Sequence, residues 1–78
     1  MNQQFDYSKL LGRIKEKGYT LKTLAESINM SSSTMSIKLS NKAQFTQKDM
    51  HGICTALEID AKYIGVYFFT PKVQKTEQ

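Results

Sequence analysis

Hydroxyl side chains crowd into one short stretch of this chain, from residue 31 to residue 40. A hydroxyl both donates and accepts hydrogen bonds, so such a run suits the reading of a polar surface. No acidic residue occurs between Glu26 and Asp49. The lysines inside that interval are Lys38, Lys42 and Lys48. Together with a net charge of +4, this pattern favours an anionic partner such as a nucleic acid.

Catalytic and metal-binding side chains are few. His51 is the only histidine and Cys54 the only cysteine. His51 has no carboxylate at metal-ligand spacing other than Asp49, which helical geometry turns elsewhere, and no set of nucleophile, acid and base assembles. We predict no enzyme activity, no catalytic residue or metal ligand, no cofactor and no small-molecule substrate. Cys54 lies in an apolar helical pattern, which predicts a core position, and His51 is predicted to lie on the surface of its helix or at the boundary of the core.

Two helices must position the hydroxyl segment. The first is capped by Thr20, ends at Asn29 and carries an apolar face at Leu21, Leu24, Ala25 and Ile28. Asn29 tolerates the left-handed conformation that a sharp turn requires. Ser31 then caps a helix that runs to about Leu39. A flexible serine-rich linker is the alternative, but Met35 and Leu39 at i and i+4 favour a helix.

Three further helices complete the prediction. One lies between Asp6 and Lys17, with Gly18 at its end. Another begins after Thr46 and buries Met50, Ile53, Cys54 and Leu57. The last begins at Asp60 and ends before Pro71, although residues 66–69 could instead form a short extended piece. The predicted fold is all-α, a compact single domain of five helices over residues 1–78, with residues 72–78 as a flexible tail.

A helix-turn-helix inserts the outer face of its second helix into the major groove of DNA. Here the outward residues are Ser33, Ser36 and Ile37. Ile37 would meet a thymine methyl, or it is simply an isolated exposed apolar residue. Lys38 borders the inner face, where its stem covers apolar surface while its ammonium reaches a phosphate. The predicted DNA contacts are Thr20, Lys22, Ser31, Ser32, Ser33, Thr34, Ser36, Ile37, Lys38, Ser40, Asn41 and Lys42.

The run Leu24 to Ser36 (LAESINMSSSTMS) resembles the helix-turn-helix of phage Cro and repressor proteins, and residues 67–73 (YFFTPKV) look like the end of small Cro-like regulators from phages or prophages of Gram-positive bacteria. The resemblance implies a lambda-repressor-like fold with Ser32, Ser33, Ser36 and Ile37 facing the bases. Three departures stand out. Asn29 replaces the usual glycine of the turn. Leu21 occupies a place where the family often has glutamine, and Lys38 stands where many members have a buried aliphatic residue.

The leading hypothesis is a Cro-type transcriptional repressor of a lysis-lysogeny switch, a homodimer that binds a pseudo-palindromic double-stranded DNA operator. Core packing is the default interpretation for some members of the apolar cluster Tyr63, Ile64, Tyr67, Phe68 and Phe69, and their surplus predicts that the cluster forms the dimer interface. The alternative is a protein-binding modulator, a co-regulator or antirepressor that captures a partner phage repressor, with an antitoxin between the two. Hydroxyl-only recognition chemistry suits the modulator. The amino-terminal residues resemble no signal peptide and no apolar run spans a membrane, so we predict a cytoplasmic protein without membrane contact.

Overall fold

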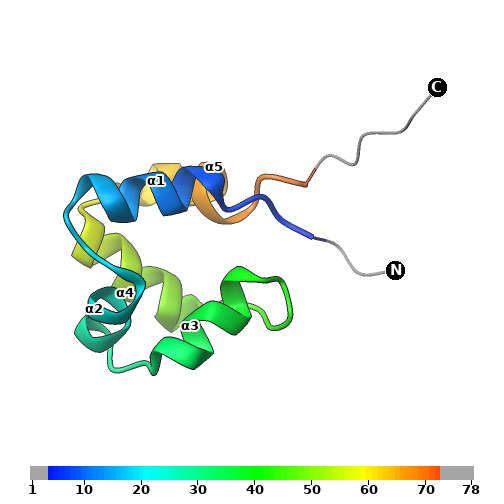
Figure 1. Cartoon of the computed structure of the whole chain (residues 1–78). Helices are drawn as coiled ribbons and strands as arrows, with labels where there is room; N and C mark the ends of the chain where they lie inside the picture. Colours follow the sequence, from blue (N-terminus) through cyan, green and yellow to red (C-terminus); the bar gives the residue numbers. More distant parts are fainter. Residues whose placement is uncertain (1–3, 73–78) are drawn as a thin grey trace.

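The computed structural model describes residues 4–72, and these residues form five α-helices and one turn of 3-10 helix. Their bounds are α1 Ser8–Glu16, α2 Leu21–Ser27, α3 Ser32–Leu39, α4 Gln47–Leu57, η1 Ala61–Tyr63 and α5 Ile64–Phe68. The predicted all-helical fold with five helices is thereby confirmed. In Figure 1, α1 and α5 lie together along one side of the molecule, and α2 and α3 lie on the other side, with α4 between. The predicted tail falls mostly on residues 73–78, which lie outside the described residues.

Side-chain caps begin three of the helices where the sequence predicts them. The hydroxyl of Thr20 accepts a hydrogen bond from the Thr23 N–H (3.1 Å), and Ser31 and Thr46 cap α3 and α4 in the same way. The chain turns sharply at Gly18 (φ 83°) and at Asn29 (φ 60°). Both residue types adopt this left-handed conformation more easily than other residues. Local sequence therefore fixes the helix boundaries.

The core draws residues from every α-helix. Leu10, Leu24, Met35, Ile53, Leu57 and Phe68 are the largest fully buried side chains. Cys54 is also buried, as predicted. Phe68 is 1% exposed and meets the Phe45 ring edge-on, with a centroid distance of 5.3 Å. Its assignment to a dimer interface was therefore wrong: Phe68 closes the hydrophobic core, because α5 turns this side of itself toward α1 and α4.

The first and last described segments meet beside the α3–α4 loop. Phe5 and Pro71 form an isolated antiparallel bridge, and residues 66–68 belong to α5 rather than to the extended piece considered from the sequence. The Asn41 amide holds this bridge in place. Its Oδ1 accepts from the Phe5 N–H (2.8 Å) and its Nδ2 donates to the Phe5 carbonyl (3.0 Å). Asn41 is therefore bonded within the protein and is not free for the predicted DNA contact.

Candidate functional site

Helix α3 divides into an inner and an outer face, as its sequence predicts. Met35 is fully buried against α2, and Leu39 is half-buried. The outer side carries the exposed residues Ser32, Ser33, Ser36, Ile37 and Ser40. Ile37 is 45% exposed and is the large apolar residue of this face. The outer face of α3, defined by these exposed residues, is the candidate contact surface.

Several of the predicted contact hydroxyls already serve the local fold. The Ser31 side chain caps α3 by accepting from the Thr34 N–H (3.1 Å), and its own O–H donates to the Thr34 hydroxyl (2.9 Å). The Ser40 hydroxyl donates to the Ser36 carbonyl (2.7 Å). Thr20 is occupied as the cap of α2. The exposed hydroxyls of Ser32, Ser33 and Ser36 therefore supply most of the hydrogen-bonding capacity that α3 offers to a partner.

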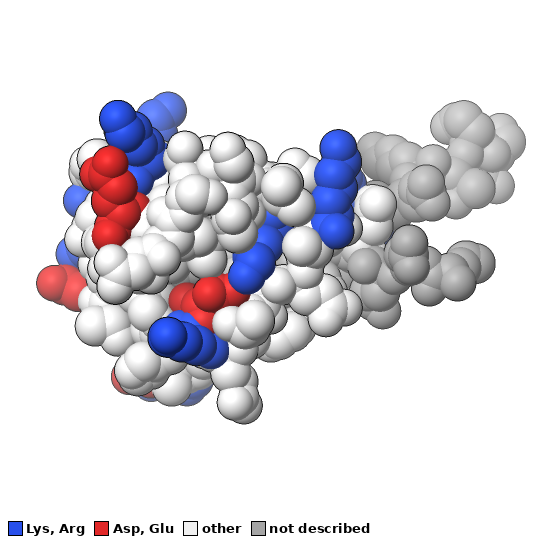
Figure 2. Space-filling view, turned by 90° about the horizontal axis from the view of Figure 1, so that it is seen from below, with Lys and Arg blue, Asp and Glu red and all other residues white. Residues whose placement is uncertain are grey.

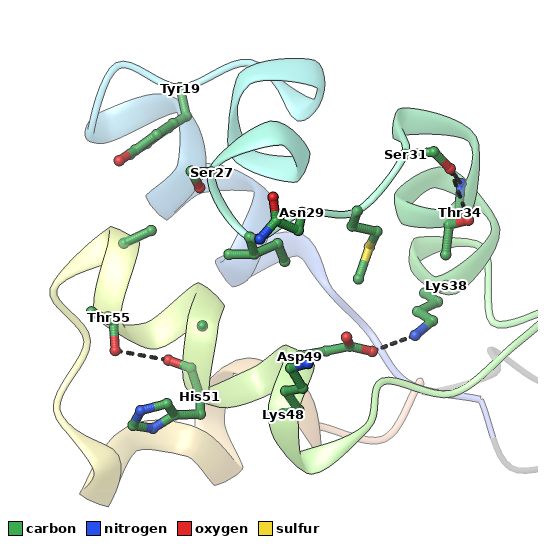
Figure 3. A pocket seen from close by; sticks show the side chains of 14 residues that line it. Tyr19, Ser27, Asn29, Ser31, Thr34, Lys38, Lys48, Asp49, His51 and Thr55 are labelled. Atoms are coloured by element: carbon green, nitrogen blue, oxygen red, sulfur yellow. Dashed lines mark hydrogen bonds and ion pairs between the residues drawn. The ribbon is translucent and has the colours of Figure 1, made fainter.

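Lys38 lies between α3 and α4 and forms an ion pair with Asp49 (Figure 3). The two side chains are 13% and 16% exposed. Asp49 also completes the cap of α4, since its Oδ2 accepts from the Thr46 N–H (3.0 Å). Burial by itself would raise the pKa of Asp49, but the hydrogen bond from Lys38 and the one from Thr46 outweigh it and hold that pKa below the ordinary value. Lys38 is thus engaged inside the fold and not at a phosphate, correcting its predicted role.

A groove separates the turn between α2 and α3 from α4, and we call it the turn groove (Figure 3). The volume of the turn groove is about 820 Å³. Asn29, Ser31 and Thr34 line one side, and Lys48, His51 and Thr55 line the other, on α4. The Lys38–Asp49 pair crosses its end. His51 is exposed here, as the sequence predicts.

Charge is sparse around α3. Figure 2, which looks at the molecule from the side of α2 and α3 in Figure 1, shows a largely white surface with blue and red side chains adjoining near its centre. Of the lysines predicted to contact phosphate, Lys22 and Lys42 are exposed, whereas Lys38 is neutralised by Asp49. Tight DNA binders place many more cations along the phosphate backbone. This face suits uncharged contact better than binding to a polyanion.

The residues predicted to form the dimer interface differ in their solvent exposure. Tyr63 and Phe69 are 47% and 49% exposed, while Ile64 and Tyr67 are half-buried against the core. Val66 is 42% exposed on the same segment and was missing from the prediction. Its place three residues after Tyr63 and three before Phe69 is the helical spacing that would have identified it. Dimer formation through this surface stays a prediction.

Among residues 4–72, no helix has the length and hydropathy needed to cross a bilayer. Within the same residues, histidine, cysteine and carboxylate side chains do not gather in groups of three that could hold a metal ion.

Fold and surface together define a small all-helical domain built on a helix-turn-helix, with a hydroxyl-rich and weakly charged second helix. The chain belongs to the family described as a protein of unknown function (DUF739), whose model matches residues 3–71. No curated protein matches the sequence.

A solved structure shows the same fold. It is the solution structure of the modulator of repression (MOR) of the temperate bacteriophage TP901-1 from Lactococcus lactis. The two sequences are 36% identical, the match covers 90% of this chain and 95% of the other, and the TM-score is 0.74.

These matches correct the family and the function predicted from sequence. The chain was assigned to phage Cro and repressor proteins, as a DNA-binding repressor, whereas its family is DUF739 and its structural relative is named a modulator of repression. The name of the relative fits the predicted phage regulatory context, but the DNA-binding repressor role was wrong. The run from Leu24 to Ser36 specifies the geometry of a helix-turn-helix, and that geometry does not determine which molecule the second helix meets.

Proposed function

We propose that this protein modulates a phage repressor by binding the repressor protein directly, in the bacterial cytoplasm. The observation that carries the proposal is the likeness to the modulator of repression of phage TP901-1, at 36% identity over 90% of the chain. Identity at this level over nearly the full length supports a shared mode of action as well as a shared fold. The sparse charge around α3 supports the same proposal, because protein interfaces are depleted of charge at their centre.

The outer face of α3 has the composition of a small protein-binding surface. Ile37, 45% exposed, stands at the middle of it, with Ser33 and Ser36 beside it. An apolar centre within a polar rim is the usual anatomy of protein interfaces, and the buried apolar residues there carry most of the binding energy. We therefore assign Ile37 as an anchor that enters the partner, with serine hydroxyls around it.

The test uses the purified repressor of the phage or prophage that carries this gene. Isothermal titration calorimetry measures binding of this protein to the repressor, and fluorescence anisotropy measures repressor binding to its labelled operator with and without this protein. We expect a direct complex and a changed operator affinity of the repressor. Tight salt-sensitive binding of this protein to the operator, without any binding to the repressor, would contradict the proposal.

A matched pair of variants locates the contact. Ile37→Glu places a charge at the centre of the outer face of α3 and should weaken repressor binding at least about tenfold, the size expected for a buried anchor. Leu11→Glu is the control, because Leu11 is 44% exposed on α1 and lies outside this face. Equal effects of the two substitutions would show that α3 is not the contact surface.

A further inference from the structure

A second groove runs between α4 and the segment formed by η1 and α5, and we call it the α4–α5 groove. The volume of this groove is about 910 Å³. Its floor is apolar and consists of Met50, Cys54, Ile59 and Ile64. Phe69, 49% exposed, forms part of its edge. An open apolar groove of this kind accommodates the apolar face of an amphipathic helix.

The polar side chains of the groove include one cation. Gln47, Lys48 and His51 line it from α4, and among residues 4–72 no carboxylate lines it. Asp49 belongs to the same helical turn but faces the turn groove, where it pairs with Lys38. Lys48 is exposed and enters no ion pair among residues 4–72. The groove therefore combines an apolar floor with the exposed ammonium of Lys48 at its side, which complements an acidic, amphipathic occupant.

The acidic residues of the chain itself are poorly available as such an occupant. Glu16, Asp49 and Glu58 pair with basic residues. Asp6 and Asp60 are held by local hydrogen bonds to Ser8 and Lys62. Among the described residues this leaves only Glu26, on α2, without such a contact. Among the described residues, most carboxylates of a second copy would thus already be engaged in ion pairs or local hydrogen bonds, so a different protein with unpaired carboxylates complements the groove better.

The two grooves share the residues Lys48, His51 and Thr55, so α4 forms a ridge between them. A partner on the α3 side of this ridge can continue across it. Stable interfaces engage about 20–30 residues on each side, and the outer face of α3 offers far fewer. Resting on the proposed function, we propose that the α4–α5 groove binds an acidic amphipathic segment of the same phage repressor, with apolar anchors on the floor and carboxylates against Lys48.

Charge variants at one position test the sign of the charge that the occupant carries. Gln47 lines the α4–α5 groove and not the turn groove. Gln47→Glu should weaken repressor binding and Gln47→Lys should strengthen it, each by about two- to fivefold at low salt, as expected for one exposed charge pair. Both effects should shrink at high salt. Lys15→Gln on α1 is the control for net charge and should leave affinity unchanged.

A second pair of variants tests the apolar part. Phe69→Ala should weaken binding about tenfold or more, the loss expected for an interface anchor. Val66→Ala is the matched control, since Val66 is 42% exposed on α5 but does not line the groove. Thermal unfolding followed by circular dichroism verifies that each variant is folded, because Phe69 also packs edge-on against Phe5 at a centroid distance of 5.7 Å.

The outcomes separate the two proposals. If Ile37→Glu abolishes repressor binding and the Gln47 and Phe69 variants leave it unchanged, the groove proposal is refuted and the proposed modulator function stands. Wild-type protein that does not bind the repressor would refute both. A wild-type dimer in sedimentation that Phe69→Ala dissociates would show that a second copy occupies the groove. Opposite effects of the Gln47 substitutions, together with a loss confined to Phe69→Ala, would support an acidic segment of the repressor.

Discussion

Replacing Asp49 with asparagine removes the charge that joins α3 to α4. Its Oδ2 accepts from the Lys38 ammonium and from the Thr46 N–H, so one carboxylate serves both an ion pair and a helix cap. The side chains of Lys38 and Asp49 are 13% and 16% exposed, well below the exposure of an ordinary surface pair. Loss of the charge leaves the Lys38 ammonium without its partner at the end of the turn groove.

The magnitude lies between two known limits. Exposed ion pairs contribute about 0–1 kcal/mol, whereas removal of one partner from a fully buried pair costs about 3–5 kcal/mol. The residual exposure of Lys38 and Asp49 places Asp49→Asn near the middle, at about 2 kcal/mol of unfolding free energy. The asparagine oxygen can still accept from Thr46, so most of the cap survives. Lys38→Met keeps the packing of the stem and should cost about 1 kcal/mol.

The assay is a double-mutant cycle. Urea unfolding at pH 7, followed by circular dichroism at 222 nm, gives the unfolding free energies of the wild type, both single variants and the double variant. We expect the double variant to lose less than the sum of the single losses, with a coupling of about 1 kcal/mol. Additive losses, agreeing within about 0.3 kcal/mol, would refute the conclusion that the pair stabilises the α3–α4 contact.

The same pair predicts a pH dependence. The pKa of Asp49 is lower in the folded protein than its ordinary value, so its contribution is present above the unfolded pKa and is lost as pH falls through the folded pKa. The advantage of the wild type over Asp49→Asn should therefore be full at neutral pH and shrink below about pH 4, the range of an unfolded aspartate. An advantage that does not change with pH would mean that the carboxylate charge is not the cause.

Three smaller predictions concern single positions. Asn41→Ala should lower the unfolding free energy by about 2–3 kcal/mol, since it removes two hydrogen bonds to Phe5 and puts alanine in a left-handed conformation (φ 67°). Asn41→Gly loses the same hydrogen bonds without the backbone strain, so it should cost less in the same urea titration. Gly18→Ala should lower the unfolding free energy by about 1 kcal/mol through its φ of 83°, and an unchanged melting temperature would argue against the left-handed turn. Burial raises the pKa of the Cys54 thiol, so iodoacetamide should modify native protein far more slowly than urea-unfolded protein at pH 8, and equal rates would place the thiol at the surface.

Sequence predicted the helices well because the relevant interactions are local. A cap joins residues three apart, as Thr20 joins Thr23 and Thr46 joins Asp49. The apolar spacing of each helix is equally local, and Met35 and Cys54 proved buried as predicted. Such interactions lie within about one helical turn, where chain geometry leaves little choice.

Sequence reasoning failed where a residue contacts a distant part of the chain. Lys38 meets Asp49 across α3 and α4, and Asn41 bonds to Phe5, 36 residues away. Both were predicted to contact DNA, Lys38 from within the second helix and Asn41 from the loop after it. Phe68 looked like an interface residue and instead closes the core. Nothing in the local pattern distinguishes an aromatic side chain buried in its own fold from one that awaits a partner.

By itself, then, the sequence determined the helix-turn-helix and the hydroxyl character of its second helix, because caps and apolar periodicity act over a few residues. The tertiary structure decided which of those side chains remain available to a partner. It neutralised Lys38 and engaged Asn41 while leaving Ile37 exposed, and it formed the α4–α5 groove from residues between Gln47 and Phe69. Whether a side chain is available depends on how the helices pack against one another, and this packing joins residues far apart in the chain.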